Sequence, residues 1–242
     1  MTQKIKPYKN SELGKKEQVT KMFDTISQEY DSLNRVISFG IDVSWRKKVL
    51  KLVKNSQPNR ILDIATGTGD LAILMAQTSA NEIIGLDISS GMLEVGKQKI
   101  EQKNLQHKIK MILADSENIP FPDNYFDAIT VAFGIRNFEN LEKGLSEILR
   151  VLKPKGVFVI LETSVPTKAP YKQGYNLYTK YVLPTIGKLF SNDKVAYGYL
   201  SESAKNFPYG KALNNILEKI GFIQVKDMPQ TMGVATIYYA SK

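Results

Sequence analysis

The stretch Ile61-Leu-Asp-Ile-Ala-Thr-Gly-Thr-Gly-Asp70 decides the fold of this chain. Its apolar beginning predicts a short buried strand, and its two glycines, Gly67 and Gly69, predict a tight turn that leads into a helix. Gly67-Thr-Gly-Asp-Leu-Ala72 satisfies the G-x-G-x-x-G/A pattern, in which glycines let the backbone approach a bound nucleotide. We therefore predict a βα unit that holds a ligand at its turn.

Short apolar runs alternate with helical patterns from residue 59 to residue 162, which is typical of a parallel sheet built from βαβ units. Their near-continuous apolar character indicates strands that are buried on both faces. We expect strands at 60–64, 82–87, 108–113, 126–132 and 156–162, and an antiparallel hairpin of strands at 222–228 and 234–240. The sequence thus predicts an α/β, Rossmann-like fold with a seven-stranded, mostly parallel sheet and an antiparallel last strand.

Helices are predicted between these strands from capping residues and stop signals. The expected helices begin at the glycine turn, follow Ser89-Ser90, and span about 139–152, 171–190 and 211–220. Lys153-Pro-Lys-Gly156 predicts a helix stop and a tight turn, and Gly221 predicts the end of the last helix. Residues 165–210 are rich in Tyr, Lys and Pro and predict irregular and helical cover outside the sheet.

Three carboxylates end or follow the first three predicted strands: Asp63, Asp87 and Asp115. In an open α/β sheet, ligands bind beyond the carboxyl ends of the strands, so these side chains would meet at one edge. Asp87 lies about 20 residues after the glycines, where an acid binds ribose hydroxyls. Asp115-Ser116 offers a carboxylate and a hydroxyl to an adenine amino group and ring edge. We expect an adenosyl ligand.

Asp63 separates the two cofactors that the glycine pattern allows. Its carboxylate can orient the turn or hold a cationic amino group, which a pyrophosphate site would not favour. S-adenosylmethionine carries such an ammonium group, so it is the cofactor that we expect. A nicotinamide oxidoreductase stays open as an alternative, because the glycine pattern alone also suits NAD.

The composition of the chain excludes several kinds of site and leaves other classes of function open. The chain has no Cys, which excludes disulfides, thiolate zinc sites, iron–sulfur clusters and a cysteine nucleophile, and we expect no metal site. No apolar run approaches the roughly 18–20 residues of a membrane span, and the lysine-rich beginning is unlike a signal peptide, so we expect a cytoplasmic protein. A net charge of +9 fits a solvated surface, a membrane surface or a non-catalytic nucleic-acid-binding module.

Longer motifs make the chain similar to a known family. Tyr30-Asp-Ser-Leu-Asn34 through Trp45, Phe121 through Asp127, Ala132-Phe-Gly-Ile-Arg-Asn137, and Arg150 through Ser164 resemble the UbiE/MenG C-methyltransferases, which methylate the quinone ring in ubiquinone and menaquinone biosynthesis. The resemblance covers nearly the whole chain. Two positions depart from the family pattern: Asp42 stands where His is usual, and Lys155 stands where Gly or Met is usual.

The resemblance implies a class I S-adenosylmethionine-dependent methyltransferase that converts demethylmenaquinol to menaquinol, with benzoquinol methylation in ubiquinone biosynthesis as the alternative. It implies one domain over 1–242, with a helical lid over 1–56 and a helical insertion over 165–210 that cover the acceptor. Its partners would be a polyprenylated demethylquinol and the inner face of a membrane, with no nucleic acid; a homodimer is also considered.

Individual residues inherit roles from the same resemblance. By resemblance, Thr66, Asp87, Asp115 and Ser116 would contact the cofactor, and Tyr30, Asn34 and Trp45 would form a lid over the acceptor. The residue pattern above adds Asp63, Gly67 and Gly69 to the cofactor site, and Tyr30, Asn34 and Asn137 are the expected acceptor contacts. Arg136 follows the fourth predicted strand, where its guanidinium could stabilise a phenolate or position water, or else pair with an acid. His107, the only histidine, is expected in an exposed loop.

Overall fold

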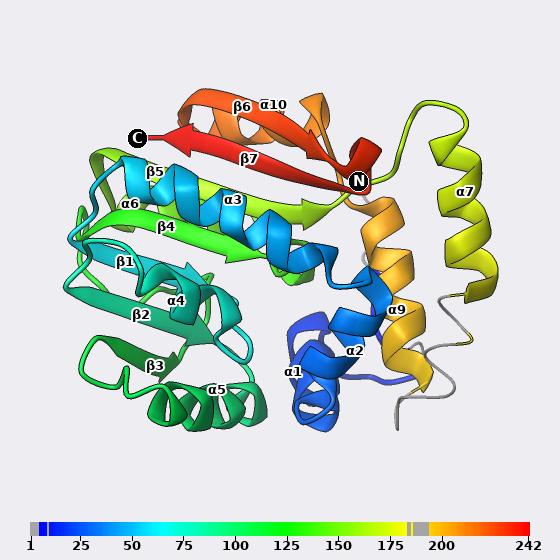
Figure 1. Ribbon diagram of the computed structural model, residues 1–242, viewed down its shortest axis with the longest axis horizontal. Helices are drawn as coiled ribbons and strands as arrows, with labels where there is room; N and C mark the ends of the chain where they lie inside the picture. The colour runs from blue at the N-terminus through cyan, green and yellow to red at the C-terminus, as the bar shows by residue number, and fades with distance from the viewer. Residues whose placement is uncertain (1–4, 9, 183–184, 186–193) are drawn as a thin grey trace.

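One mixed sheet with the strand order β3-β2-β1-β4-β5-β7-β6 forms the centre of the computed structural model, which describes residues 5–8, 10–182, 185 and 194–242 (Figure 1). The strands are β1 Arg60–Ile64, β2 Glu82–Asp87, β3 Ile109–Leu113, β4 Phe126–Ala132, β5 Leu152–Thr163, β6 Ile223–Gln230 and β7 Ala235–Ser241. Strands β1 to β5 pair in parallel, whereas β7 pairs antiparallel with both β5 and β6. The predicted α/β fold, with its antiparallel last strand, is confirmed.

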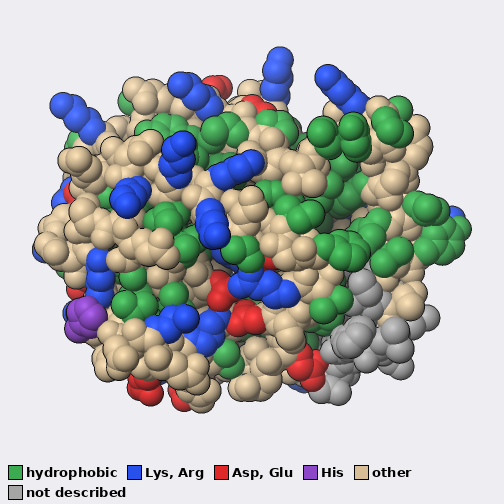
Figure 2. All heavy atoms as spheres, viewed as in Figure 1, with side chains coloured by type: hydrophobic (Ala, Val, Ile, Leu, Met, Phe, Trp, Pro, Cys, Tyr) green, Lys and Arg blue, Asp and Glu red, His purple; other side chains and the backbone are tan. Residues whose placement is uncertain are grey.

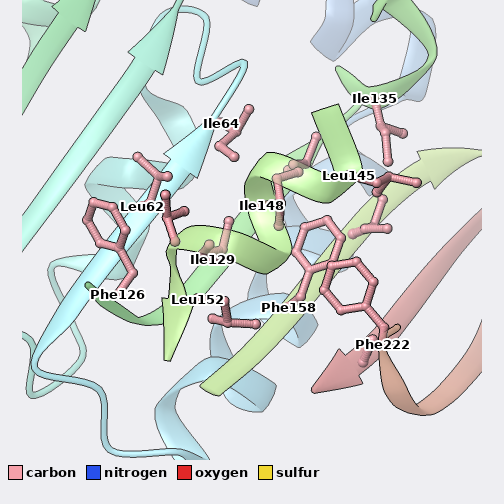
Figure 3. Packing of buried hydrophobic residues seen from close by; sticks show 14 of the residues in the cluster. Leu62, Ile64, Phe126, Ile129, Ile135, Leu145, Ile148, Leu152, Phe158 and Phe222 are labelled. Atoms are coloured by element: carbon pink, nitrogen blue, oxygen red, sulfur yellow. The ribbon is translucent and has the colours of Figure 1, made fainter. Parts of the chain in front are cut away.

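Helices cover both faces of the sheet, because its strands are apolar on both sides. The helices are α3 Ile41–Asn55, α4 Asp70–Met75, α5 Ser90–Gln102, α6 Leu141–Val151 and α10 Lys211–Ile220. On one face, α6 and α10 pack on a cluster that includes Leu62, Ile129 and Phe158, and the rings of Phe158 and Phe222 stack with centroids 5.2 Å apart (Figure 3). On the other face, α3, α4 and α5 pack on a second cluster around Val49 and Ile61.

A third group of helices lies beyond the carboxyl ends of the parallel strands (Figure 1). It consists of α1 Lys15–Ile26, α2 Tyr30–Ser38, the short 3₁₀ helix η1 Ile135–Asn137, and α9 Lys194–Asn206. Met22, Leu33 and Met92 form a separate buried cluster with Tyr199 there, which joins α1 and α2 to α5 and α9. This cluster places α1 and α2 over the edge of the sheet where ligands are expected.

Two local predictions differ from the structure. Lys153–Gly156 forms no separate turn: α6 does end at Val151, but β5 begins at once, because buried Leu152 pairs with Phe126 across a bulge. The helix predicted over 171–190 is instead α7 Tyr171–Leu177, followed by one turn of π-helix, η2 Tyr178–Val182. Residues 183–184 and 186–190 of that prediction lie outside the described residues.

Candidate active site

The turn after β1 is held in place by a buried carboxylate. Asp63 accepts hydrogen bonds from the Thr66 hydroxyl at its Oδ2 and from the Thr130 hydroxyl at its Oδ1, both at 2.6 Å. Burial raises the pKa of Asp63 to about 6, although the two hydroxyls oppose the rise. The carboxylate therefore joins the turn to β4. Asp63 is not among the residues that line the neighbouring cavity, and its predicted contact with a ligand ammonium stays a prediction.

Gly67 and Gly69 make the turn possible, because both have a left-handed backbone with φ of +55° and +79°. Gly67 lines a cavity at the ends of β1, β2, β3 and β4, which we call the strand-end cavity; it measures about 640 Å³ with its open mouth. A Cβ on Gly69 would lie 3.2 Å from the Met111 side chain. The absence of a side chain at Gly69 therefore lets Met111 pack closely beneath the turn.

Asp87 ends β2 and lines the strand-end cavity beside Gly67. Its Oδ2 accepts the Gly67 N–H at 2.8 Å, and its Oδ1 accepts the Ser89 N–H at 2.9 Å. Burial raises the pKa of Asp87, while these backbone bonds oppose the rise. An ionised carboxylate offers about four acceptor positions, so it can accept ligand hydroxyls in addition to these backbone groups. The geometry fits an acid that binds ribose.

The loop after β3 contributes Asp115 and Ser116 to the same cavity. Asp115 accepts the Glu117 N–H and pairs with Lys16 of α1 at 2.5 Å. This hydrogen bond raises the pKa of Lys16. Lys16 was not predicted at the site, because α1 is far from β3 along the chain. The pairing brings α1 over the position where an adenine ring is expected.

A second cavity of about 940 Å³ lies between helices, and we call it the helix cavity. Side chains of α2, α3, α7, η2 and α9 line it, and most of its wall is apolar or aromatic. Tyr30 and Phe133 line both cavities, so the two spaces meet at these rings. Two ligands could thus face each other across one junction.

Tyr30 and its neighbour Asn34 lie where acceptor contacts were predicted, since both line the helix cavity. Burial raises the pKa of the Tyr30 phenol, although a hydrogen bond with Asn34 and the charge of Arg136 oppose the rise. Asn137 lies differently: it lines the strand-end cavity, and its Oδ1 accepts the hydroxyl of Tyr199 at 3.0 Å. Its predicted contact with the acceptor stays a prediction, and its position favours the cofactor side.

Arg136 lines the helix cavity and is almost fully buried. Its Nη1 donates to the Phe133 carbonyl at 2.7 Å and to Glu162 Oε1 at 2.6 Å. Burial alone would lower the pKa of Arg136, but the charge of Glu162 holds it above its ordinary value. The structure thus shows the pairing of Arg136 with an acid in the wall of the helix cavity, and its role towards a phenolate or water stays a prediction. Glu162 was not predicted as a site residue, although it lies near the end of β5.

Asp42 replaces the histidine of the family pattern and is tied into a charged network. It accepts the Ser38 hydroxyl at 2.7 Å and forms an ion pair with Arg46, which follows it by one helical turn. Arg46 in turn lies 5.5 Å from the centre of the Phe133 ring. Trp45 donates its indole N–H to Thr231 at 2.9 Å. Ion pairs and hydrogen bonds therefore fix the side chains on this side of the helix cavity.

No group of three or more His, Cys, Asp or Glu that could hold a metal ion occurs among the described residues. None of the helices in the described ranges has both the length and the apolar character of a membrane span. His107 is exposed in the loop before β3, at the opposite end of that strand from the cavity, as expected.

Comparisons with known proteins agree with this geometry. The model of the ubiE/COQ5 methyltransferase family matches residues 11–242. The chain is 50% identical to a demethylmenaquinone methyltransferase of Bacteroides fragilis over 99% of this chain and 98% of that protein. It is 43% identical to a ubiquinone/menaquinone biosynthesis C-methyltransferase UbiE of Geobacter sulfurreducens over 99% and 93%.

Solved structures show the same fold at low identity. An S-adenosylmethionine-dependent methyltransferase of Thermotoga maritima has a TM-score of 0.66 at 18% identity, over 92% of this chain and 99% of that chain. The [4+2]-cyclase SpnF has the same TM-score and identity over 94% and 96%. A shared fold thus hosts different reactions, and the sequence relatives carry the assignment. The chain belongs to the ubiE/COQ5 methyltransferase family.

Proposed function

We propose that this protein transfers the methyl group of S-adenosylmethionine to a ring carbon of demethylmenaquinol. The observation that carries the proposal is the junction of the two cavities at Tyr30 and Phe133. The relative at 50% identity, which is named for demethylmenaquinone, supports this acceptor. Family membership also removes the nicotinamide oxidoreductase considered from the glycine pattern.

The strand-end cavity would hold the cofactor. The Asp87 carboxylate suits the ribose hydroxyls, and Asp115 with Ser116 suits the adenine edge. Asp63 and Thr66 would act through the turn that they fix. When bound, S-adenosylmethionine supplies an electrophilic methyl group on a sulfonium centre.

The helix cavity would hold the quinol ring with a hydroxyl towards Arg136. A ring carbon becomes strongly nucleophilic when a neighbouring hydroxyl loses its proton, and a fixed cation stabilises the resulting oxyanion. Glu162 holds that guanidinium in place, and the aromatic rings of Tyr30, Trp45 and Phe133 exclude water around the junction. These residues align and stabilise the acceptor for in-line displacement.

We also propose how the remaining segments serve this reaction. The chain would act as one domain, in which residues 1–56 and 165–210 cover the acceptor, since α2, α3, α7, η2 and α9 contribute to the helix cavity. The acceptor would carry a polyprenyl tail, which would bring the protein to the inner face of a membrane. The homodimer stays a prediction that sedimentation would test.

The test is methyl transfer from radiolabelled S-adenosylmethionine to chemically reduced acceptors. We expect label in menaquinol from demethylmenaquinol, with no transfer to the oxidised quinone. A demethylated benzoquinol serves as the second acceptor, because the relative at 43% identity is named for both pathways. Faster labelling of the benzoquinol would reassign the substrate, and label in neither quinol would contradict the proposal.

A further inference from the structure

One edge of the helix cavity is formed where two segments far apart in the sequence meet. Ile37 and Ser38 at the end of α2 line the cavity together with Tyr178 of η2. The Tyr178 hydroxyl donates to the Ile37 carbonyl at 2.7 Å, and the rings of Tyr178 and Phe39 lie 6.1 Å apart. The α2–α3 corner and the α7–η2 segment therefore adjoin at this edge.

Large apolar side chains are exposed on both of these segments. Phe39 is 73% exposed at the corner, and Leu177 and Tyr181 are 62% and 57% exposed on the other segment. None of the seven residues of α7 is buried. Further members of the patch are Val36, Ile41, Tyr171 and Val182. We call these seven residues the apolar rim. An exposed apolar patch of this kind marks a surface that contacts another phase or molecule.

The charge around the apolar rim is positive. Lys172 and Lys180 are exposed on α7 and η2, and these two elements contain no acidic residue. On α3, Lys47, Lys51 and Lys54 are exposed, whereas the only acid, Asp42, is buried and paired with Arg46. Figure 2 shows basic side chains along α3 and apolar side chains over α7 on the same face, with no acidic side chain over α7.

We propose that the apolar rim docks on the surface of an anionic phospholipid bilayer. Apolar side chains that enter the acyl boundary, beside lysines at the headgroups, give binding of this type. The polyprenyl tail of the acceptor then stays in the lipid while its ring enters the helix cavity. This route for the tail rests on the proposed function, whereas the docking itself does not.

Vesicle sedimentation of the full chain tests the docking. We expect binding to vesicles of phosphatidylglycerol with phosphatidylcholine, much weaker binding to phosphatidylcholine alone, and release by salt. The double variant Phe39→Asn with Leu177→Gln should bind about tenfold more weakly. Asparagine tolerates the left-handed φ of +51° at position 39, so the corner should still fold. Ile223→Gln is the matched control, because Ile223 is 54% exposed on β6, away from the rim.

Activity on a short-tailed, water-soluble demethylquinol separates this inference from the proposed function. The double variant should methylate that acceptor at the wild-type rate and a long-tailed acceptor in vesicles more slowly. Unchanged vesicle binding by the double variant, equal binding to neutral vesicles, or a dimer that the double variant abolishes would each overturn the docking proposal. Wild-type vesicle binding without methylation of any quinol would instead overturn the proposed function and leave the docking surface intact.

Discussion

The strand-end cavity and the helix cavity share Tyr30 and Phe133 but are built in different ways. In the strand-end cavity, Asp87 and Asp115 end or follow adjacent strands, so the parallel register of β2 and β3 brings them together. The helix cavity combines helices from both ends of the chain with the short helix that carries Arg136. A shared fold thus specifies the first cavity, whereas the second depends on helix packing particular to the chain. Variants that affect one cavity and spare the other test this division.

The largest effect is expected from Arg136→Lys in the helix cavity. A lysine keeps a positive charge beside Glu162 but lacks the planar donor fork, so we expect kcat to fall about 100-fold. The affinity for S-adenosylhomocysteine, measured by calorimetry, should not change. Arg150→Lys is the control, because Arg150 pairs with Glu147 on α6 outside both cavities. A wild-type kcat for Arg136→Lys would show that the Arg136 guanidinium does not contribute to the reaction.

A large effect on stability is expected at the support of the strand-end cavity. Burial raises the pKa of Asp63 from 3.8 to about 6, so the folded state binds the proton more tightly than the unfolded state. The free energy of unfolding should therefore fall as the pH rises from about 4 to 7, by about 3 kcal/mol relative to Asp63→Asn. Urea unfolding of both proteins across this range measures it. Parallel pH profiles would show that Asp63 keeps an ordinary pKa.

A smaller effect is expected from Asp87→Asn, which replaces one carboxylate acceptor with an amide donor. The variant should bind S-adenosylhomocysteine about 30-fold more weakly, because hydrogen bonds to a charged group are lost. Its kcat at saturating cofactor should stay close to the wild-type value. Asp127→Asn is the comparison, since Asp127 accepts backbone N–H groups of residues 59 and 60 at the other end of the sheet. Equal cofactor affinity in the Asp87 and Asp127 variants would contradict the role of Asp87.

The smallest effect is expected from Lys16→Ala. The pair of Lys16 with Asp115 is about one-third exposed, and ion pairs of that exposure contribute at most about 1 kcal/mol. Cofactor affinity should fall by no more than about fivefold, and added salt should reduce the difference. A loss as large as that of Asp87→Asn would mean that α1 holds the cofactor directly.

The sheet and the strand-end cavity could be predicted because their signals are local. Apolar runs and glycines give the strands and the turn, and strand order then brings Asp87 next to Gly67. The residues of the helix cavity were harder to predict from local sequence patterns. Glu162, and Lys16 of the strand-end cavity, meet their partners only through long-range packing, and Asn137 follows Arg136 in sequence yet lines the other cavity. Lys153–Gly156, near the start of β5, were predicted as a turn because the pairing of Leu152 with Phe126 is not visible in either segment alone.

The relation between the two cavities is tested most directly by a crystal structure with S-adenosylhomocysteine and a short-tailed menaquinol. The account predicts the adenosyl group in the strand-end cavity beside Asp87 and Asp115. It predicts the quinol ring in the helix cavity with an oxygen on Arg136, and the sulfur at the junction of Tyr30 and Phe133. A quinol ring bound outside the helix cavity, or separated from the sulfur by these two rings, would contradict it.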